Sequence, residues 1–279
     1  RGARAVDEPE PRRPGYSRAA MRVVSLTCSN TEILAALGCA GLLVGVDDHS
    51  DWPPEAVAGL PRVGPDLDVD VARVAALAPD LVLASLTVPG HERVVEALDR
   101  AGLPYVAPEP TSLADVARDV RWIAGLVGVP ERGEEVAAEM ERALGIGEPA
   151  PAPPGRRARL LLQWWPKPVI APGRLSWASE LIARAGGENP LAGEEVKSRP
   201  LTDQEVRELA PDAMVLSWCG VAPEKVRPDV VLANPAWQDL DFVRRCRVYR
   251  VPEALVGRPS PRLVEGFRAL REIVAGLAG

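Results

Sequence analysis

The chain has 279 residues, and 33 lysines and arginines against 39 aspartates and glutamates give it a net charge of −6. No basic run stands out, which argues against a nucleic acid partner, and no apolar stretch approaches the ~18 residues of a membrane-spanning helix. The four cysteines form no C-x-x-C pair, so the sequence favours neither a disulfide framework nor a zinc site.

Residues 1–20 differ from the rest of the chain because they are rich in arginine and proline and lack the apolar core of a signal peptide. They are expected to be a disordered N-terminal segment, with the ordered fold beginning at Met21. If Met21 is the natural start, the protein would be cytoplasmic, and the codons upstream of Arg1 would decide this.

The ordered region opens with an apolar run at 23–26, which a helix-like pattern follows. Ser29 and Glu32 have the S-x-x-E spacing of a capping box, and Gly38 stands where a left-handed C-terminal cap would be. Apolar runs and helical patterns then alternate, which is typical of a parallel sheet flanked by helices. The expected strands are 22–26, 42–46, 81–85 and 103–107, and the expected helices are 30–37, 70–78 and 91–101.

Two consecutive helices are expected in the middle of the chain. Ser112 and Asp115 cap the first, which ends at Gly128, and Pro130 opens the second, which runs to about Leu144. Residues 145–157 then read as a loop by composition.

The alternation restarts after this loop. The expected elements are strands 159–165 and 213–218, helix 177–185 after Ser176, helix 203–210, and a last helix from Ser260-Pro261. Two motifs of the first half recur in the same order: L-A-P-D-L-V-L-A-S at 77–85 resembles L-A-P-D-A-M-V-L-S at 209–217, and residues 29–38 resemble 176–187. The sequence therefore favours a two-lobed α/β protein joined by the paired helices.

Motifs of common enzymes are missing, including G-x-S-x-G, the phosphate-binding loop, H-E-x-x-H and G-x-G-x-x-G. The two histidines, His49 and His91, are interpreted as loop residues near solvent rather than as metal ligands. The tryptophans are more informative, because five of them follow an expected strand or flank a helix start, where open α/β sheets bind ligands. These five are Trp52, Trp164, Trp165, Trp177 and Trp218, whereas Trp122 is expected in the core.

Several motifs together resemble a known family. R-V-V-S-L-T-C-S-N-T-E-I-L-A-A-L-G, L-L-V-G-V-D-D-H-S-D-W-P-P-E, L-P-R-V-G, L-A-P-D-L-V-L-A-S and G-R-P-S-P-R-L-V-E-G-F resemble the substrate-binding proteins of ABC importers for cobalamin, haem and ferric siderophores. The nearest match is the cobalamin branch, from about Met21 to the C-terminus. The resemblance implies an α/β protein of the class III periplasmic-binding-protein fold. It has two Rossmann-like lobes (21–129 and 147–279), a long rigid bridging helix (130–146) and a ligand cleft between the lobes.

The resemblance also implies the site residues. Asn30 in the first turn, Trp52 in the counterpart of a D-Y-P-P turn, Gln163-Trp164 at a strand end and Arg258 before S-P-R match ligand-contacting positions. Asp66 and Leu86 stand where the cobalamin protein has tryptophans, and residues 197–199 replace another, so the aromatic surface is expected to be redistributed. The expected ligand-binding residues are Asn30, Trp52, Asp66, Gln163, Trp164, Trp165, Arg199, Trp218 and Arg258.

The resemblance further implies a partner, an ABC permease dimer, which a glutamate on each lobe would contact. Glu92 matches the first of these glutamates, while Gln204 occupies the second position, with Glu205 one residue later. The chain is thus expected to be a monomeric, non-catalytic protein with no cofactor, which carries cobalamin as transported ligand and lies outside the cytoplasm. The alternatives are a haem or ferric-siderophore carrier, a cytoplasmic corrinoid carrier, and a two-lobed transferase.

Overall fold

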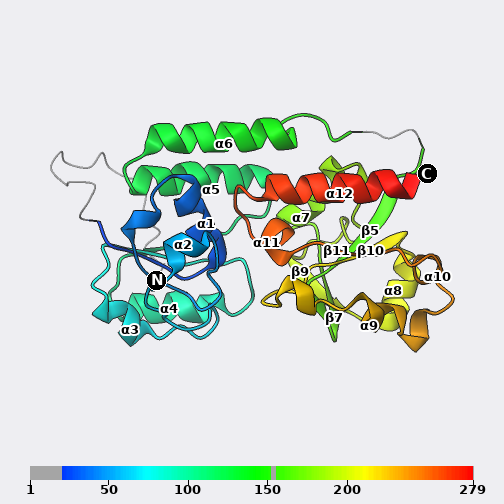
Figure 1. Cartoon of the computed structure of the whole chain (residues 1–279), viewed down its shortest axis with the longest axis horizontal. Coiled ribbons are helices and arrows are strands. Elements are labelled where there is room, and N and C mark those ends of the chain that lie inside the picture. The colour runs from blue at the N-terminus through cyan, green and yellow to red at the C-terminus, as the bar shows by residue number, and fades with distance from the viewer. Residues whose placement is uncertain (1–20, 152–154, 279) are drawn as a thin grey trace. The chain divides into compact units, whose positions relative to one another are not determined.

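The computed structural model describes residues 21–151 and 155–278, so the expectation for residues 1–20 lies outside the described residues. Strands and helices alternate through two compact units, which confirms the α/β class (Figure 1). Unit 1 takes residues up to Glu109 and Arg118–Ala137, and unit 2 takes Pro110–Ala117 and the chain from Ala138 onward. The division expected from the sequence, with a bridging helix at 130–146, stays a prediction.

Unit 1 contains a four-stranded parallel sheet in the order β2-β1-β3-β4. Its strands are almost wholly apolar because both faces are covered, as parallel sheets require. The strands are β1 (Val23–Ser25), β2 (Leu43–Val46), β3 (Leu81–Leu83) and β4 (Tyr105–Val106). The helices are α1 (Cys28–Ala36), η2 (Ala40–Leu42), α2 (Pro54–Val57), α3 (Val71–Ala76) and α4 (His91–Arg100).

The first helix begins earlier than the S-x-x-E spacing predicted. Its N-cap is Thr27, which has extended backbone angles (φ −148°, ψ 148°) and makes no side-chain capping bond. Ser29 lies inside the helix, where it cannot cap, and its hydroxyl pairs with that of Thr27 at 3.2 Å. The expected capping box at Ser29 and Glu32 was therefore wrong.

The two expected middle helices are confirmed as α5 (Leu113–Leu126) and α6 (Pro130–Leu144). Ser112 and Asp115 form the reciprocal cap: the Asp115 N–H donates to the Ser112 hydroxyl at 3.1 Å, and the Ser112 N–H donates to the Asp115 carboxylate at 3.1 Å. Gly128 follows α5 with φ +77°, a backbone conformation that favours glycine.

Unit 2 has its own parallel sheet, in the order β11-β10-β5-β8, and a separate antiparallel sheet, β6-β7-β9. The strands are β5 (Ala158–Gln163), β6 (Trp165–Pro166), β7 (Val169–Pro172), β8 (Gly187–Glu188), β9 (Ser198–Leu201), β10 (Ala213–Leu216) and β11 (Val248–Arg250). The helices are α7 (Trp177–Arg184), α8 (Asp203–Leu209), η3 (Pro223–Lys225), α9 (Pro228–Leu232), η4 (Pro235–Trp237), α10 (Asp241–Arg244), α11 (Glu253–Val256) and α12 (Leu263–Ala278).

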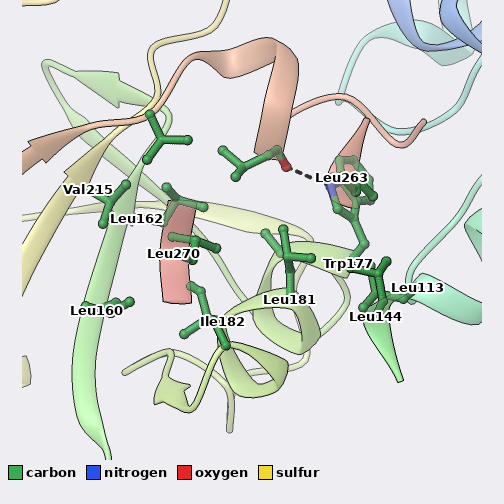
Figure 2. Packing of buried hydrophobic residues seen from close by; sticks show 14 of the residues in the cluster. Leu113, Leu144, Leu160, Leu162, Trp177, Leu181, Ile182, Val215, Leu263 and Leu270 are labelled. Carbon is green, nitrogen blue, oxygen red and sulfur yellow. Dashed lines mark hydrogen bonds between the residues drawn. The ribbon is translucent and has the colours of Figure 1, made fainter. Parts of the chain in front are cut away.

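The core of unit 2 joins β5, β10, α7 and α12 around Trp177 (Figure 2). Trp177 is 8% exposed, and its indole N–H donates to the Val256 carbonyl at 2.9 Å. The last helix starts at Leu263 rather than at Pro261, because Ser260 and Pro261 lie in a turn in which the Leu263 N–H donates to the Ser260 carbonyl at 3.1 Å.

The repeated L-A-P-D motif forms the same structure in both units. Ala78 and Ala210 both adopt a left-handed backbone, with φ +44° and +41°. The aspartate two residues later then accepts a backbone N–H from the start of the neighbouring strand: the Arg22 N–H, just before β1, donates to Asp80 at 2.8 Å, and the Arg159 N–H in β5 donates to Asp212 at 2.7 Å. The internal repeat therefore encodes one helix-to-strand junction that is used twice.

This junction predicts a stabilising substitution. A left-handed backbone costs a non-glycine residue roughly 1–2 kcal/mol, and replacement by glycine removes this cost. Glycine also gives the unfolded chain more conformational freedom, which cancels part of the gain in stability. Ala78→Gly and Ala210→Gly should each raise the free energy of unfolding by about 0.5–1 kcal/mol in urea titrations. The control is Ala75→Gly inside α3, which should lower it by about 1 kcal/mol. Equal destabilisation by all three would contradict the assignment.

Candidate functional site

Three loops at the carboxyl edge of the unit 1 sheet each expose one large apolar side chain. Trp52 is 43% exposed, Leu67 40% and Val88 41%. Their loops follow β2, the short bridge of Arg62 with Val46, and β3, so all three leave the sheet at the same edge. We call these three residues the unit 1 apolar edge. Sequence reasoning missed Leu67 and Val88, although their position after strand-like segments was a usable signal.

A buried polar network fixes the loop that carries Trp52. Asp47, with no exposed surface, accepts from the Ser50 hydroxyl at 2.5 Å and from the His49 N–H at 2.9 Å. The Arg62 guanidinium donates to the carbonyls of Asp47 (2.8 Å) and Ser50 (2.6 Å). Burial raises the pKa of Asp47 above its usual value. This loop is therefore held in place before any ligand arrives.

His91 and Asp66 join the two other loops. The His91 Nε2 lies 3.2 Å from the Asp66 carboxylate, and the Val88 N–H donates to Nδ1 at 3.3 Å. A neutral imidazole with its proton on Nε2 satisfies both contacts. Burial alone would raise the pKa of Asp66, but the hydrogen bond from His91 outweighs it and lowers that pKa. His91 is only 3% exposed, so its interpretation as a loop residue near solvent was wrong, whereas His49 is exposed.

Asn30 and Glu92 lie on two helices of unit 1. Asn30 is 3% exposed and donates from Nδ2 to the Ala84 carbonyl at 2.7 Å, which ties α1 to the end of β3. Glu92 is exposed in the first turn of α4 and accepts from the Gly90 N–H at 2.8 Å, where the helix dipole favours a carboxylate.

In unit 2 the expected site residues divide between surface and core. Gln163, the last residue of β5, is 1% exposed and accepts at 2.8 Å from the indole N–H of Trp218, which is itself 7% exposed. Trp164 is half-buried against the unit 2 core, and Trp165 in β6 is 42% exposed.

Of the five tryptophans expected to face a ligand, the structure thus exposes Trp52 and Trp165 most and buries Trp177 and Trp218. Trp122 is half-buried rather than a fully buried core residue.

The expected basic contacts carry internal ion pairs. Arg199 in β9 contacts Glu194 at 2.5 Å and Glu205 at 2.6 Å, and Arg258 contacts Glu253 at 2.9 Å. Glu205 also completes a capping box with Thr202 at the start of α8. The backbone and side-chain bonds from Thr202, together with Arg199, lower the pKa of Glu205 to about 2. Both arginines are therefore preorganised by carboxylates of the same unit.

The described residues contain neither a metal-binding cluster nor a membrane-spanning helix. No group of three or more His, Cys, Asp or Glu side chains there could hold a metal ion. No described helix is both long and apolar enough to cross a membrane.

The chain is similar to proteins of known type. A family model described as periplasmic binding protein matches residues 23–255. An uncharacterized ABC transporter substrate-binding lipoprotein, YvrC of Bacillus subtilis (strain 168), is 28% identical over 258 residues, which cover 91% of this chain and 79% of the relative. A vitamin B12-binding protein of Yersinia pestis (strain Pestoides F) is 29% identical over 201 residues, 72% of this chain and 71% of the relative.

Solved structures agree on the fold. The periplasmic vitamin B12 binding protein BtuF of Vibrio cholerae has a TM-score of 0.74 at 22% identity, covering 93% of this chain and 98% of that one. The periplasmic heme-binding protein RhuT from Roseiflexus sp. RS-1 has a TM-score of 0.77 at 25% identity, and the match covers 93% of this chain and 99% of RhuT. These likenesses confirm the class III periplasmic-binding-protein fold. The relatives are transport substrate-binding proteins, which confirms the interpretation that the chain is not an enzyme.

Proposed function

Because the chain belongs to the periplasmic binding protein family, we propose that it is the substrate-binding component of an ABC importer and carries a large metal chelate, with cobalamin as the first candidate. Relatives named as a lipoprotein and as periplasmic proteins support a location outside the cytoplasm. The protein would act as a monomer that hands its ligand to a permease dimer.

The unit 1 apolar edge is the observation that carries this proposal. Trp52, Leu67 and Val88 expose apolar surface from three loops that internal hydrogen bonds hold in place. Burial of such surface stabilises a complex by roughly 25 cal/mol per Å² before ordering costs, so a broad, flat ligand gains most from it. A sugar or an amino acid would instead need a cluster of hydrogen-bonding groups, whereas a corrin or porphyrin presents a matching apolar face.

The polar site residues would then serve the periphery of the ligand. We propose that Asn30, Asp66 and Gln163 bond its amide groups, and that Arg199 and Arg258 meet its amides or carboxylates. Trp164 and Trp165 would supply the aromatic surface of unit 2, and the buried Trp218 would hold Gln163 in place through its indole N–H. The hydrogen bonds that these side chains already make would fix their orientation, as a preorganised site requires.

Haem is the second candidate, supported by the haem-binding structural neighbour and by the exposed imidazole of His49 three residues before Trp52.

Parallel calorimetric titrations with cyanocobalamin, haemin and ferrichrome separate the candidates. Cyanocobalamin should bind at micromolar affinity or tighter, which is about −8 kcal/mol. No heat and no quenching of tryptophan fluorescence with cyanocobalamin, alongside binding of haemin or ferrichrome, would refute the choice of cobalamin.

Trp52 provides the sharpest test of the apolar edge. Trp52→Ala should weaken cyanocobalamin binding by more than 1 kcal/mol, at least about fivefold in Kd, because exposed aromatic anchors dominate such surfaces. Trp52→Phe keeps a flat ring and should remain within about twofold of wild type. Calorimetry on both variants measures this, and unchanged affinity in Trp52→Ala would remove the apolar edge from the site.

Docking to a permease is proposed through Glu92 and, with a shifted register, Glu205. Rim charges of this kind set orientation and association rate more than bulk affinity. Glu92→Arg should slow association with the cognate permease, with cyanocobalamin binding unchanged, and should act more strongly than Glu205→Arg. The matched control is Glu131→Arg, which changes another exposed first-turn helix acid among the unit 1 residues. If Glu92→Arg and Glu131→Arg associate as wild type does, Glu92 is not a docking residue.

A further inference from the structure

Unit 2 contains a pocket of about 540 Å³, which shares only Gln163 with the expected ligand-binding residues. This volume lies within the range of roughly 300–1,000 Å³ that is usual for small-molecule sites. The turn between β6 and β7 forms one side and the segment from α9 to η4 the other, and β7 and α9 lie at the same end of unit 2 (Figure 1). The lining includes Gln163, Lys167, Asp203, Val230, Ala233 and Trp237.

Apolar side chains form about half of the pocket wall, and polar groups form the rest. Val169, Leu201 and Val231 are buried side chains, and Val230 exposes 39% of its surface. Prolines at 166, 168 and 235 stiffen both sides. Such walls suit a planar ring system, which loses little conformational freedom when it enters.

The polar and charged side chains of the pocket indicate which chemical group would be attached to the ring of the ligand. Trp237 is 2% exposed, and its indole N–H has no hydrogen-bond acceptor among the described residues. This N–H is itself buried, so Trp237 serves the pocket as an apolar ring. Lys167 is an exposed cation in the β6–β7 turn. The opposite charge in the lining, Asp203, accepts from the Asn234 amide at 3.1 Å. The pocket thus fits an aromatic ring joined to an anionic group, which Lys167 would meet.

Gln163 lines this pocket and is also one of the side chains proposed above to bond the ligand. A group in the pocket could therefore be an appendage of a ligand whose main body lies elsewhere. Cobalamin has such an appendage, a benzimidazole joined through a ribose and a phosphodiester to the corrin. Haem and cobinamide have none.

We propose that the pocket is a subsite for the nucleotide tail of a cobalamin-type ligand, with the base against Val230 and Trp237 and the phosphodiester near Lys167. This inference rests on the proposed function. It makes the pocket the element of unit 2 that distinguishes complete cobalamins from corrinoids without the tail.

The test compares cyanocobalamin with dicyanocobinamide by calorimetry. Wild type should bind cyanocobalamin at least tenfold more tightly. Ala233→Trp fills the pocket from an exposed position and should weaken cyanocobalamin at least tenfold but dicyanocobinamide less than twofold. Ala192→Trp, an exposed alanine of unit 2 outside the pocket, is the matched control. Lys167→Ala should weaken cyanocobalamin about threefold to tenfold, and Lys225→Ala should leave it unchanged.

The results distinguish a failure of the subsite from a failure of the proposed ligand. Equal wild-type affinity for the two corrinoids, or equal effects of Ala233→Trp on both, would overturn the subsite while leaving corrinoid transport intact. No binding of either corrinoid would overturn the proposed ligand and the subsite together. Circular dichroism and urea titration of Ala233→Trp establish that the variant is folded.

Discussion

Trp177→Ala should lower the free energy of unfolding by about 3–5 kcal/mol, the usual cost of removing a buried tryptophan. Trp177 lies in the core of unit 2 among Leu113, Leu181 and Leu263, and its N–H donates to the Val256 carbonyl at 2.9 Å (Figure 2). Alanine would leave a large cavity and a buried carbonyl without its donor. Urea titration followed by circular dichroism measures the loss.

Two controls separate packing from other effects. Trp177→Phe retains most of the ring but removes the N–H, so it should cost roughly 1–3 kcal/mol and remain folded. Trp165→Ala removes a tryptophan that is 42% exposed and should stay within about 0.5 kcal/mol of wild type. If Trp177→Phe and Trp165→Ala were equally mild while Trp177→Ala impaired only ligand binding, Trp177 would belong to the ligand surface and not to the core.

The parallel sheets were predictable because strands buried on both faces appear as short apolar runs bounded by turn residues. The antiparallel sheet was not, since β6 and β9 are short and contain Pro166 and Pro200, which usually indicate loops. The repeated L-A-P-D motif predicted a shared junction but not its left-handed alanines, which depend on how the helix end meets the sheet.

The candidate site was less predictable than the fold. Strand ends singled out Trp52 and Trp164, and the family resemblance added Gln163, but residue type could not tell which tryptophans are exposed. Trp218 is buried because Gln163 supplies an acceptor for its N–H, a pairing across 55 positions that no local pattern carries. Leu67 and Val88 gain their importance only when three separate loops leave one sheet edge together.

The addition of one methyl group, in Gly266→Ala, should have the second large effect on stability. Gly266 in α12 faces α11 so closely that a Cβ there would overlap the Leu255 carbonyl oxygen and would lie 2.8 Å from both the Leu255 carbonyl carbon and Val256 Cγ1. Because two of these atoms are backbone, α11 and α12 must separate. This matters for the core, since Val256 also accepts the Trp177 indole N–H.

Gly266→Ala should therefore lower the free energy of unfolding by about 2–3 kcal/mol, because overpacking outweighs the gain of roughly 1 kcal/mol that alanine brings to a helix. Gly276→Ala is the matched control, since a Cβ at this position of the same helix would meet no atom within 4 Å, and it should raise stability by about 0.5 kcal/mol. Urea titrations of both variants measure the opposite signs. Stabilisation by both would show that α11 does not pack against α12 at Gly266, because only that contact distinguishes the two glycines.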